Sequence, residues 1–152
     1  MKIYFAADHA GVRLKERLVA FVRDELLFEV EDLGAHEIDP RDDYPDLIRR
    51  AAQVVSENPT NRAIVLGGSG QGEAIVANRY RNVRAVVWYG GDIDIVRLSR
   101  EHNDANILSL GARLMNEETA QEAVRAWLST RFSGDERHVR RIQKIDDGPV
   151  HT

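Results

Sequence analysis

Short apolar segments alternate along this 152-residue chain with longer stretches in which apolar residues recur at helical spacing. Short apolar runs are typical of strands buried on both faces, whereas spacings of three and four residues are typical of amphipathic helices. Strands that alternate with helices in this way predict βαβ crossovers, and therefore a parallel sheet covered by helices on both faces. The candidate strands are residues 3–7, 28–30, 63–66, 83–88 and 106–110.

Amphipathic stretches lie between and after these candidate strands. Asn116 suits the N-cap of one helix, because Glu117 and Glu118 would then lie in its first turn. We expect one three-layer α/β/α domain of the Rossmann-like kind over residues 1–145, with a five-stranded parallel sheet, and a C-terminal tail at 146–152. The pattern does not predict the strand order. The expected helices cover residues 12–26, 47–55, 73–79, 92–101, the stretch after Asn116, and 137–144.

Charge and cysteine content narrow the classes of function. With 21 basic and 25 acidic residues the net charge is −4, which argues against general binding to nucleic acid or to a membrane surface, although a local basic patch could bind phosphate. Cysteine is absent, so disulfides, thiolate catalysis and cysteine metal sites are excluded. The first apolar run reaches Asp8 too soon for a signal peptide or a membrane span. We expect a cytoplasmic enzyme or binding domain.

Ligands of parallel sheets bind outside the carboxyl ends of the strands. Four groups of polar residues or glycines follow predicted strands or helices and are therefore candidates for a binding site. Asp8 and His9 follow the first strand; Asp8 could instead serve as a helix N-cap and His9 as a loop residue. His102 and Asn103 lie between a helix and the last strand, where a histidine also suits a helix C-terminus. The other two groups are the glycine-rich segment at 67–73 and Arg113 together with the basic segment 137–141.

The glycine-rich segment contains four glycines in six residues, at positions 67–72, more than a tight turn requires. Alternate glycines at Gly68, Gly70 and Gly72 allow the backbone to approach a ligand, and the next helix would present its free N–H groups to an anion. The spacing matches neither the dinucleotide-binding fingerprint nor a P-loop. Glu73 could act only through its charge at the helix N-terminus, or as a base directed into the loop.

The basic segment near the C-terminus can be interpreted in two ways. Arg137 and Arg141 are four residues apart on one helical face, with Arg140 beside them, and could bind a phosphate together. A run of charges is otherwise a solvated face. No group has the spacing of a metal site, and no set of serine, histidine and aspartate residues indicates a catalytic triad.

Taken together, these motifs resemble the type B ribose-5-phosphate isomerases, a family that includes galactose-6-phosphate isomerase subunits. The resemblance covers nearly the whole chain in the order of the family. The motifs that carry it are Asp8-His9-Ala10-Gly11 with Leu14-Lys15, Asp43-Tyr44-Pro45, Gly68-Ser69-Gly70-x-Gly72 with Ala77-Asn78, Arg84-Ala85, His102-Asn103-Asp104-x-Asn106, Gly111-x-Arg113 and Glu136-Arg137-His138-x-x-Arg141-Ile142.

The resemblance implies isomerisation of a phosphorylated aldose to a ketose through an enediolate, with neither metal nor cofactor. Asp8 and His102 would open the sugar ring, and Ser69 with the amides of the glycine loop would hold the enediolate oxygen. Family members form dimers with shared active sites; the neighbour would supply His102, Asn103 and Arg113, and a tetramer is left open. The implied substrate- and phosphate-binding residues are His9, Tyr44, Gly68, Gly70, Gly72, Asn103, Arg113, Arg137, His138 and Arg141.

One departure from the family concerns the base. Many members carry a cysteine as the proton-transfer base, expected here at the position of Gly68, and this chain has none. The chain is similar instead to the branch in which a glutamate after the glycine loop takes that role, which would be Glu73. A carboxylate can carry a proton between adjacent carbons if nearby amides stabilise the oxyanion.

Three alternatives remain open at this point. The same chemistry could act on a galactose phosphate or a tetrose phosphate. The glycine loop could serve a non-catalytic phosphometabolite-binding domain, or the chain could be a subunit that needs a related partner chain. Asp8, Glu73 and His102 together favour catalysis, because phosphate binding needs none of them.

Overall fold

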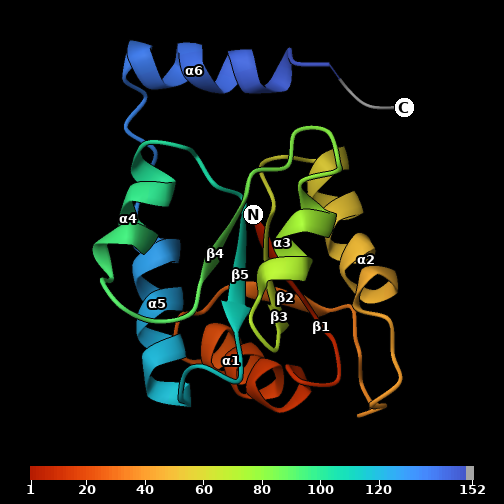
Figure 1. Cartoon of the computed structure of the whole chain (residues 1–152). Coiled ribbons are helices and arrows are strands. Elements are labelled where there is room, and N and C mark those ends of the chain that lie inside the picture. The colour runs from red at the N-terminus through yellow and green to blue at the C-terminus, as the bar shows by residue number, and fades with distance from the viewer. Residues whose placement is uncertain (150–152) are drawn as a thin grey trace.

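The computed structural model describes residues 1–149, and the predicted alternation of strands and helices is present (Figure 1). The strands are β1 (Lys2–Ala7), β2 (Glu29–Asp32), β3 (Arg62–Gly67), β4 (Ala85–Trp88) and β5 (Ile107–Gly111). The helices are α1 (Val12–Asp24), α2 (Tyr44–Glu57), α3 (Gln71–Ala77), α4 (Asp94–Glu101), α5 (Glu117–Ser129) and α6 (Glu136–Asp146). Within residues 1–149, no helix has both the length and the apolar character needed to cross a membrane.

The five strands form one parallel sheet in the order β2-β1-β3-β5-β4. This confirms the predicted class and supplies the strand order. The chain goes from β1 to β2 on one side, and then crosses to β3 on the other. Ligands of open parallel sheets bind at the carboxyl ends of the strands where the order reverses in this way. The fold therefore places the expected site after β1 and β3.

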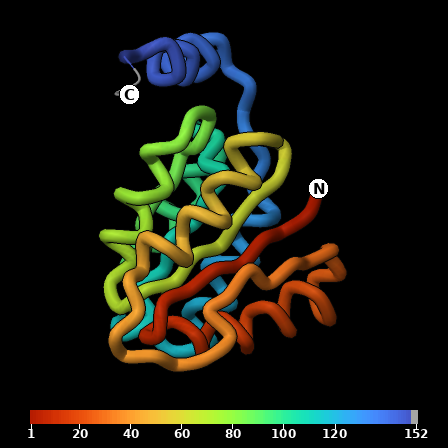
Figure 2. Tube along the Cα trace, turned by 90° about the vertical axis from the view of Figure 1, so that its right-hand side faces the viewer, coloured from red at the N-terminus to blue at the C-terminus, as the bar shows by residue number. Residues whose placement is uncertain are grey.

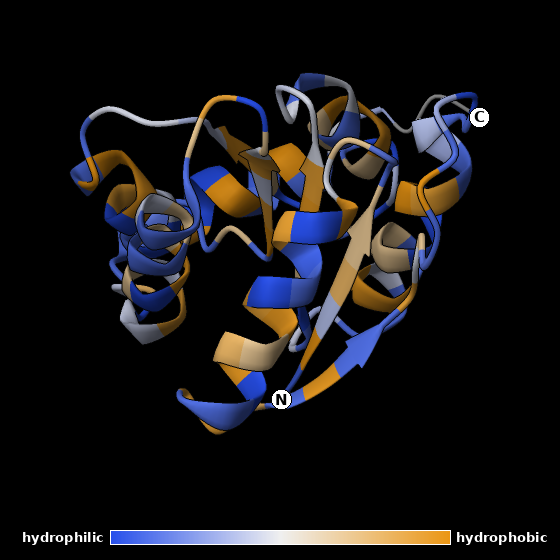
Figure 3. Ribbon diagram, turned by 90° about the horizontal axis from the view of Figure 1, so that it is seen from below, coloured by the Kyte–Doolittle hydropathy of each residue, from blue (hydrophilic) through white to orange (hydrophobic). Residues whose placement is uncertain are grey.

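Helices cover both faces of the sheet, as predicted. One apolar cluster joins the sheet to α1, α4 and α5 and includes the fully buried Leu18 and Trp127. The other joins the opposite face to α2 and α3 and includes Ile48 and Val55. Figures 2 and 3 show these layers from the side and from below, and the colours of Figure 3 mark the apolar stretches of the strands and helices. Burying one such large side chain contributes ~1.5–3 kcal/mol, so the two clusters hold the strand ends in place.

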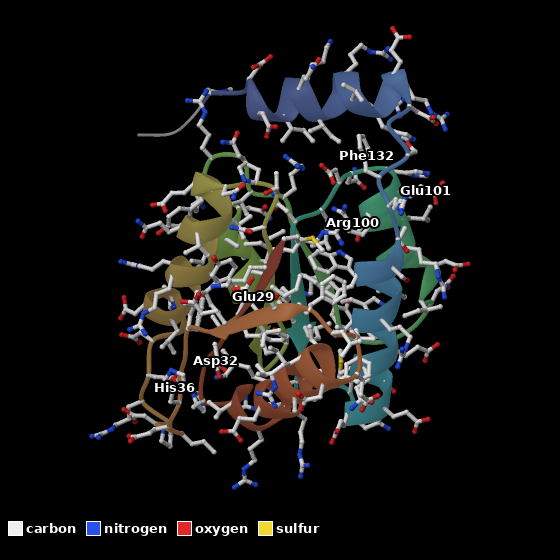
Figure 4. The ribbon with its side chains drawn as sticks, turned by 180° about the vertical axis from the view of Figure 1, so that it is seen from behind. Glu29, Asp32, His36, Arg100, Glu101 and Phe132 are labelled. Carbon is white, nitrogen blue, oxygen red and sulfur yellow. The ribbon has the colours of Figure 1, made fainter. Side chains whose placement is uncertain are left out.

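The edge strand β2 alternates exposed glutamates with half-buried residues. Glu29 and Glu31 both pair with the ammonium of Lys2, at 3.2 and 2.9 Å, and such charges discourage pairing with another chain. Asp32, labelled in Figure 4 at the end of β2, accepts hydrogen bonds from Lys15 Nζ at 2.6 and 2.5 Å. Lys15 is wholly buried, so this ion pair fastens α1 to the end of β2.

Several boundaries differ from the predicted ones. Helix α3 begins at Gln71, two residues early, because Gly70 takes a left-handed conformation (φ 79°) that turns the chain directly into the helix. Strand β4 begins at Ala85, not at residue 83, because Val83 N–H bonds back to the carbonyl of Tyr80 in a turn. The predicted N-cap is confirmed: Asn116 Oδ1 accepts a hydrogen bond from the backbone of Thr119.

Helix α6 is longer than predicted and lies outside the two helix layers that cover the sheet (Figure 1). It continues to Asp146, which was assigned to the tail, and this residue pairs with Arg84 at 3.4 Å. The last part of the predicted tail, residues 150–152, lies outside the described residues. Figure 1 shows α6 beyond the end of the sheet that is opposite to the arrowhead of β5. The basic segment is therefore far from the carboxyl ends of the strands in its own chain.

Candidate active site

A cavity of about 440 Å³ opens at the carboxyl ends of β1 and β3, where the strand order reverses. It contains seven of the predicted site residues, and adds Leu114. Residues as far apart in sequence as Asp8 and Leu114, which are separated by 106 positions, thus meet at one point of the sheet edge. The lining residues are Asp8, Tyr44, Gly68, Ser69, Gly72, Glu73, Arg113 and Leu114.

Asp8 directly follows β1 and is held by the turn into α1. Its Oδ1 accepts hydrogen bonds from the backbone N–H groups of Ala10 at 2.9 Å and Gly11 at 3.2 Å. Gly11 is required because a Cβ there would lie 2.8 Å from the carbonyl oxygen of Leu66. Burial raises the pKa of Asp8 even though these N–H groups favour the ionised form. Asp8 can therefore exchange protons more readily than an exposed aspartate near neutral pH.

Glu73 lies in the first turn of α3 and is 4% exposed. Its carboxylate packs against the backbone of Gly67. Burial raises the pKa of Glu73, and the negative charge of Asp8 raises it further, while a hydrogen bond from its own N–H opposes the rise. A buried carboxylate with a raised pKa, directed at a cavity, is suited to remove a proton from carbon.

The space occupied by the Glu73 carboxylate depends on Gly67, which the sequence analysis did not single out. A Cβ on Gly67 would lie 1.9 Å from Glu73 Oε1, whereas a Cβ on Gly68 would face the end of the Arg113 side chain, 3.3 Å from Nη1. The family cysteine was expected at position 68. The geometry favours position 67, because only a side chain at 67 would occupy the place of the Glu73 carboxylate.

The glycine loop is built so that other groups can approach its backbone. The hydroxyl of Ser109 donates to the carbonyl of Gly70 at 2.7 Å, which fixes the left-handed residue. The ring of Tyr44 packs on Gly72, where a Cβ would lie 2.6 Å from the ring carbon Cζ. In the first turn of α3 the N–H of Gln71 donates to Ser69 Oγ at 3.4 Å and that of Glu73 donates to its own carboxylate, which leaves the N–H of Gly72 available at the edge of the cavity.

His9 is held by Asp42, a residue that the sequence analysis did not single out. Asp42 Oδ2 accepts the backbone N–H of His9 at 2.8 Å, and Oδ1 lies 2.7 Å from the ring Nδ1. Asp8, His9 and Asp42 bring possible metal-ligand atoms within 4.8 Å of one another. Because Asp42 already binds two nitrogens of His9, we interpret the group as a hydrogen-bonded pair beside Asp8. No sequence motif marks Asp42; only its contact with His9 identifies it.

The remaining predicted residues form a second group at the opposite end of the sheet. His102 ends α4, and its ring stacks on that of His138 from α6, with centroids 4.4 Å apart. His138 is 5% exposed, and its pKa is lowered by burial and by the nearby His102 and Arg137. Asn103 follows His102, and Arg137 and Arg141 lie on α6, so all three belong to this end of the sheet. Within one chain, this group does not reach Glu73.

Arg113 was expected to come from a neighbouring subunit together with His102 and Asn103. That expectation is wrong, because Arg113 lines the same cavity as Glu73 in its own chain. The backbone explains the placement: β5 runs beside β3, and Arg113 N–H donates to the carbonyl of Gly68 at 3.1 Å. The chain thus supplies one arginine, Arg113, to its own cavity.

The fold and this cavity define a class: an α/β protein with two buried carboxylates and a glycine-rich loop at the switch point of its sheet, as expected of an acid–base enzyme for a small substrate. A family model described as Ribose/Galactose Isomerase matches residues 3–145. The chain belongs to the ribose/galactose isomerase family.

Individual relatives agree with this assignment. The chain is similar to ribose-5-phosphate isomerase B of Mycobacterium tuberculosis (strain H37Rv), with 38% identity over 143 residues, covering 93% of this chain and 86% of the relative. It is similar in structure to a ribose 5-phosphate isomerase of Thermotoga maritima, with a TM-score of 0.88, 42% identity, and coverage of 97% and 98%. Ribose-5-phosphate isomerase B of Mycoplasma genitalium with bound ribulose-5-phosphate gives a TM-score of 0.89 at 33% identity, covering 95% of this chain and 93% of that one.

Proposed function

We propose that this chain is an aldose–ketose isomerase that interconverts ribose 5-phosphate and ribulose 5-phosphate. The observation that carries the proposal is the buried Glu73 carboxylate, which shares one cavity with Asp8 and the glycine loop. Non-catalytic phosphate binding does not require two buried carboxylates with raised pKa values. The type of reaction and the pentose phosphate substrate are inferred from the family and from the names of the relatives.

In the proposed mechanism Asp8 and His102 open the furanose ring by acid–base catalysis. Glu73 then removes the proton from C2 of the open-chain aldose, and the electron pair of that bond forms the enediolate. The protonated Glu73 returns the proton to C1, while a proton moves from the oxygen on C2 to the oxygen on C1, which gives the ketose. Ser69 and the amides of Gly68, Gly70 and Gly72 stabilise the negative oxygen.

The phosphate is assigned to basic residues from two chains. His9 and Arg113 lie on the Glu73 side of one chain, while Arg137, His138 and Arg141 lie on α6 at the far end, beside His102 and Asn103. We propose a homodimer in which the far end of one chain completes the cavity of the other. The separation of the two groups within one chain supports this arrangement, since the ring-opening pair Asp8 and His102 is otherwise divided.

A coupled assay on the purified chain tests the reaction. Turnover of ribose 5-phosphate without any added partner chain is expected, with a higher kcat/KM than for galactose 6-phosphate or a tetrose phosphate. A higher kcat/KM for another sugar phosphate would support the proposed isomerisation but assign it to a different substrate. Binding without turnover would favour a phosphometabolite-binding domain, and activity only with a related chain would favour a two-component enzyme.

Mixed dimers test the shared site. Glu73→Gln and His102→Asn proteins, each nearly inactive, are unfolded together and refolded as a mixture. In a shared-site dimer a mixed pair carries both lesions in one site and leaves the other intact, so about a quarter of all sites regain activity. Either variant refolded alone provides the control. No recovery, with mixed dimers confirmed by mass, would refute the shared site.

We further propose a cytoplasmic location and a step of the pentose phosphate pathway, since ribose and ribulose 5-phosphate are the proposed substrates. Both follow from the proposed reaction alone, and depend on it.

A further inference from the structure

The first half of helix α6 is joined to the body of the protein through residues 101–104 at the end of α4. Figures 1 and 2 show the helix beyond the amino ends of the strands. The linker before it donates a backbone hydrogen bond from Ser133 to the carbonyl of Glu101 at 3.0 Å, and Figure 4 labels Glu101 near the linker residue Phe132. The ring of His138 then stacks on His102 at an interplanar angle of 14°. Both contacts fix only the first half of the helix.

The other end of α6 is fixed by the guanidinium of Arg84. Its Nε donates to the carbonyl of Asp104 at 3.1 Å, and its Nη2 lies 3.1 Å from Asp104 Oδ2. Its Nη1 donates to Asp146 Oδ2 at 3.4 Å, at the last residue of α6. The Arg84 side chain is 12% exposed, and an ion pair shielded from water is screened less than an exposed one. One arginine therefore connects the end of α6 to the segment that carries His102.

The end of this bridge at Asp104 is rigid. Asp104 has a left-handed backbone (φ 45°), and its Oδ1 accepts a hydrogen bond from Arg100 Nη1 at 2.8 Å. The Arg100 side chain is 4% exposed and also donates to the carbonyl of Ala105. The backbone N–H of Arg84 donates to Asn106 Oδ1 at 2.7 Å. Because Arg84 is itself held by the core, it holds the end of α6 at a fixed position relative to the core.

We propose that Arg84 is a positioning residue, which sets the orientation of α6 relative to the 101–104 segment so that the two are presented to the neighbouring chain as one unit. The inference rests on the proposed function, in which His102 and the α6 residues Arg137 and Arg141 complete the same site. Charge-assisted hydrogen bonds to a phosphate depend on the geometry of their donors, so the placement of these arginines affects substrate binding. The planar fork of an arginine can bind two carboxylates at once, which a lysine does poorly.

Asp146→Ala tests the inference with little risk to the fold, because it removes only the α6 end of the bridge. Asp147→Ala is the matched control: it removes the same charge from the next residue, whose side chain joins none of the ion pairs or hydrogen bonds found within residues 1–149. Asp146→Ala should raise KM for ribose 5-phosphate about 3- to 10-fold, as expected for a weakened charge-assisted contact, and change kcat less than about 2-fold. Asp147→Ala should match the wild type, and Arg84→Lys should resemble Asp146→Ala.

Limited proteolysis with trypsin provides a readout that does not require activity. Cleavage within α6 after Arg140, Arg141 or Lys144 should be faster in Asp146→Ala than in Asp147→Ala, because the helix opens locally more often. Equal KM values and equal cleavage rates in the two variants would overturn the inference. Faster cleavage with an unchanged KM would also overturn it, since the bridge would then hold α6 without positioning it for substrate. Failure of the proposed function is a separate result: the wild type itself would not isomerise ribose 5-phosphate.

Discussion

Gly67→Ala should displace the catalytic carboxylate without altering any charged group. Position 67 has no positive φ, so alanine suits its backbone, and the effect comes only from the added methyl group. That carbon would lie 1.9 Å from Glu73 Oε1, 2.1 Å from Cδ and 2.5 Å from Oε2. Carbon and oxygen atoms that are not bonded approach to about 3.3 Å, so the carboxylate must move by about 1.4 Å.

The size of this displacement predicts the loss of rate. A 1 Å misplacement can cost 10²-fold in rate, so kcat should fall by at least ~10²-fold, which corresponds to about 2.7 kcal/mol in the barrier. KM should change much less, because the phosphate-binding residues are not touched. The coupled assay with ribose 5-phosphate measures both constants, and circular dichroism checks that the variant is folded.

A double-mutant cycle shows whether the loss acts through Glu73. Glu73→Gln alone should lower kcat by ~10²–10⁴-fold, the usual range for loss of a general base. If Gly67→Ala acts by displacing Glu73, the double variant should be no slower than Glu73→Gln alone, a strong coupling between the two sites. Additive losses, or a Gly67→Ala enzyme with nearly normal kcat, would refute the reasoning.

Three further outcomes are expected. Because burial raises the pKa of Glu73 above its ordinary 4.5, its ionisation disfavours the folded state as pH rises through 4.5 toward the folded-state pKa. Glu73→Gln should therefore have a higher Tm than the wild type at pH 7, and this difference should vanish near pH 3. Asp32→Asn should lower the free energy of unfolding in urea by ~3–5 kcal/mol, since it leaves Lys15 buried and unpaired; Lys15→Met should cost less, because Asp32 is 23% exposed, and the reverse order would contradict the argument. Asp42→Ala should raise KM for ribose 5-phosphate ~3- to 10-fold by freeing His9, and more than Asp42→Asn, which keeps an acceptor for the His9 backbone; unchanged KM values would show that His9 needs no support.

The local pattern of the sequence was sufficient to predict the fold class and the half of the site that lies at the carboxyl ends of the strands. Apolar runs and helical spacing report burial directly, so β1, β3 and β5 were found close to their true bounds. The residues after the strands then had to meet, since parallel strands end at one edge. Asp8, Ser69 and Glu73 share a cavity for this reason.

Other features depended on contacts that one sequence does not encode locally. The strand order arises from which helices cover which face, and no single segment carries that information. The place of Arg113 follows from β5 lying beside β3, which also required the order of the sheet. Gly67 and Asp42 act through the space and the hydrogen bonds of residues six and 33 positions away, so the sequence indicated the role of neither.

The location of the Glu73 group and the His102 group at opposite ends of the sheet has a consequence for how activity depends on the amount of protein. In the proposed assembly an isolated chain holds two incomplete halves, so turnover follows the number of pairs. Well above the dissociation constant of the dimer the rate is proportional to total protein, and well below it the rate grows with the square of the concentration. Dilution alone would then lower the specific activity, and substrate, by binding across both chains, would draw them back together.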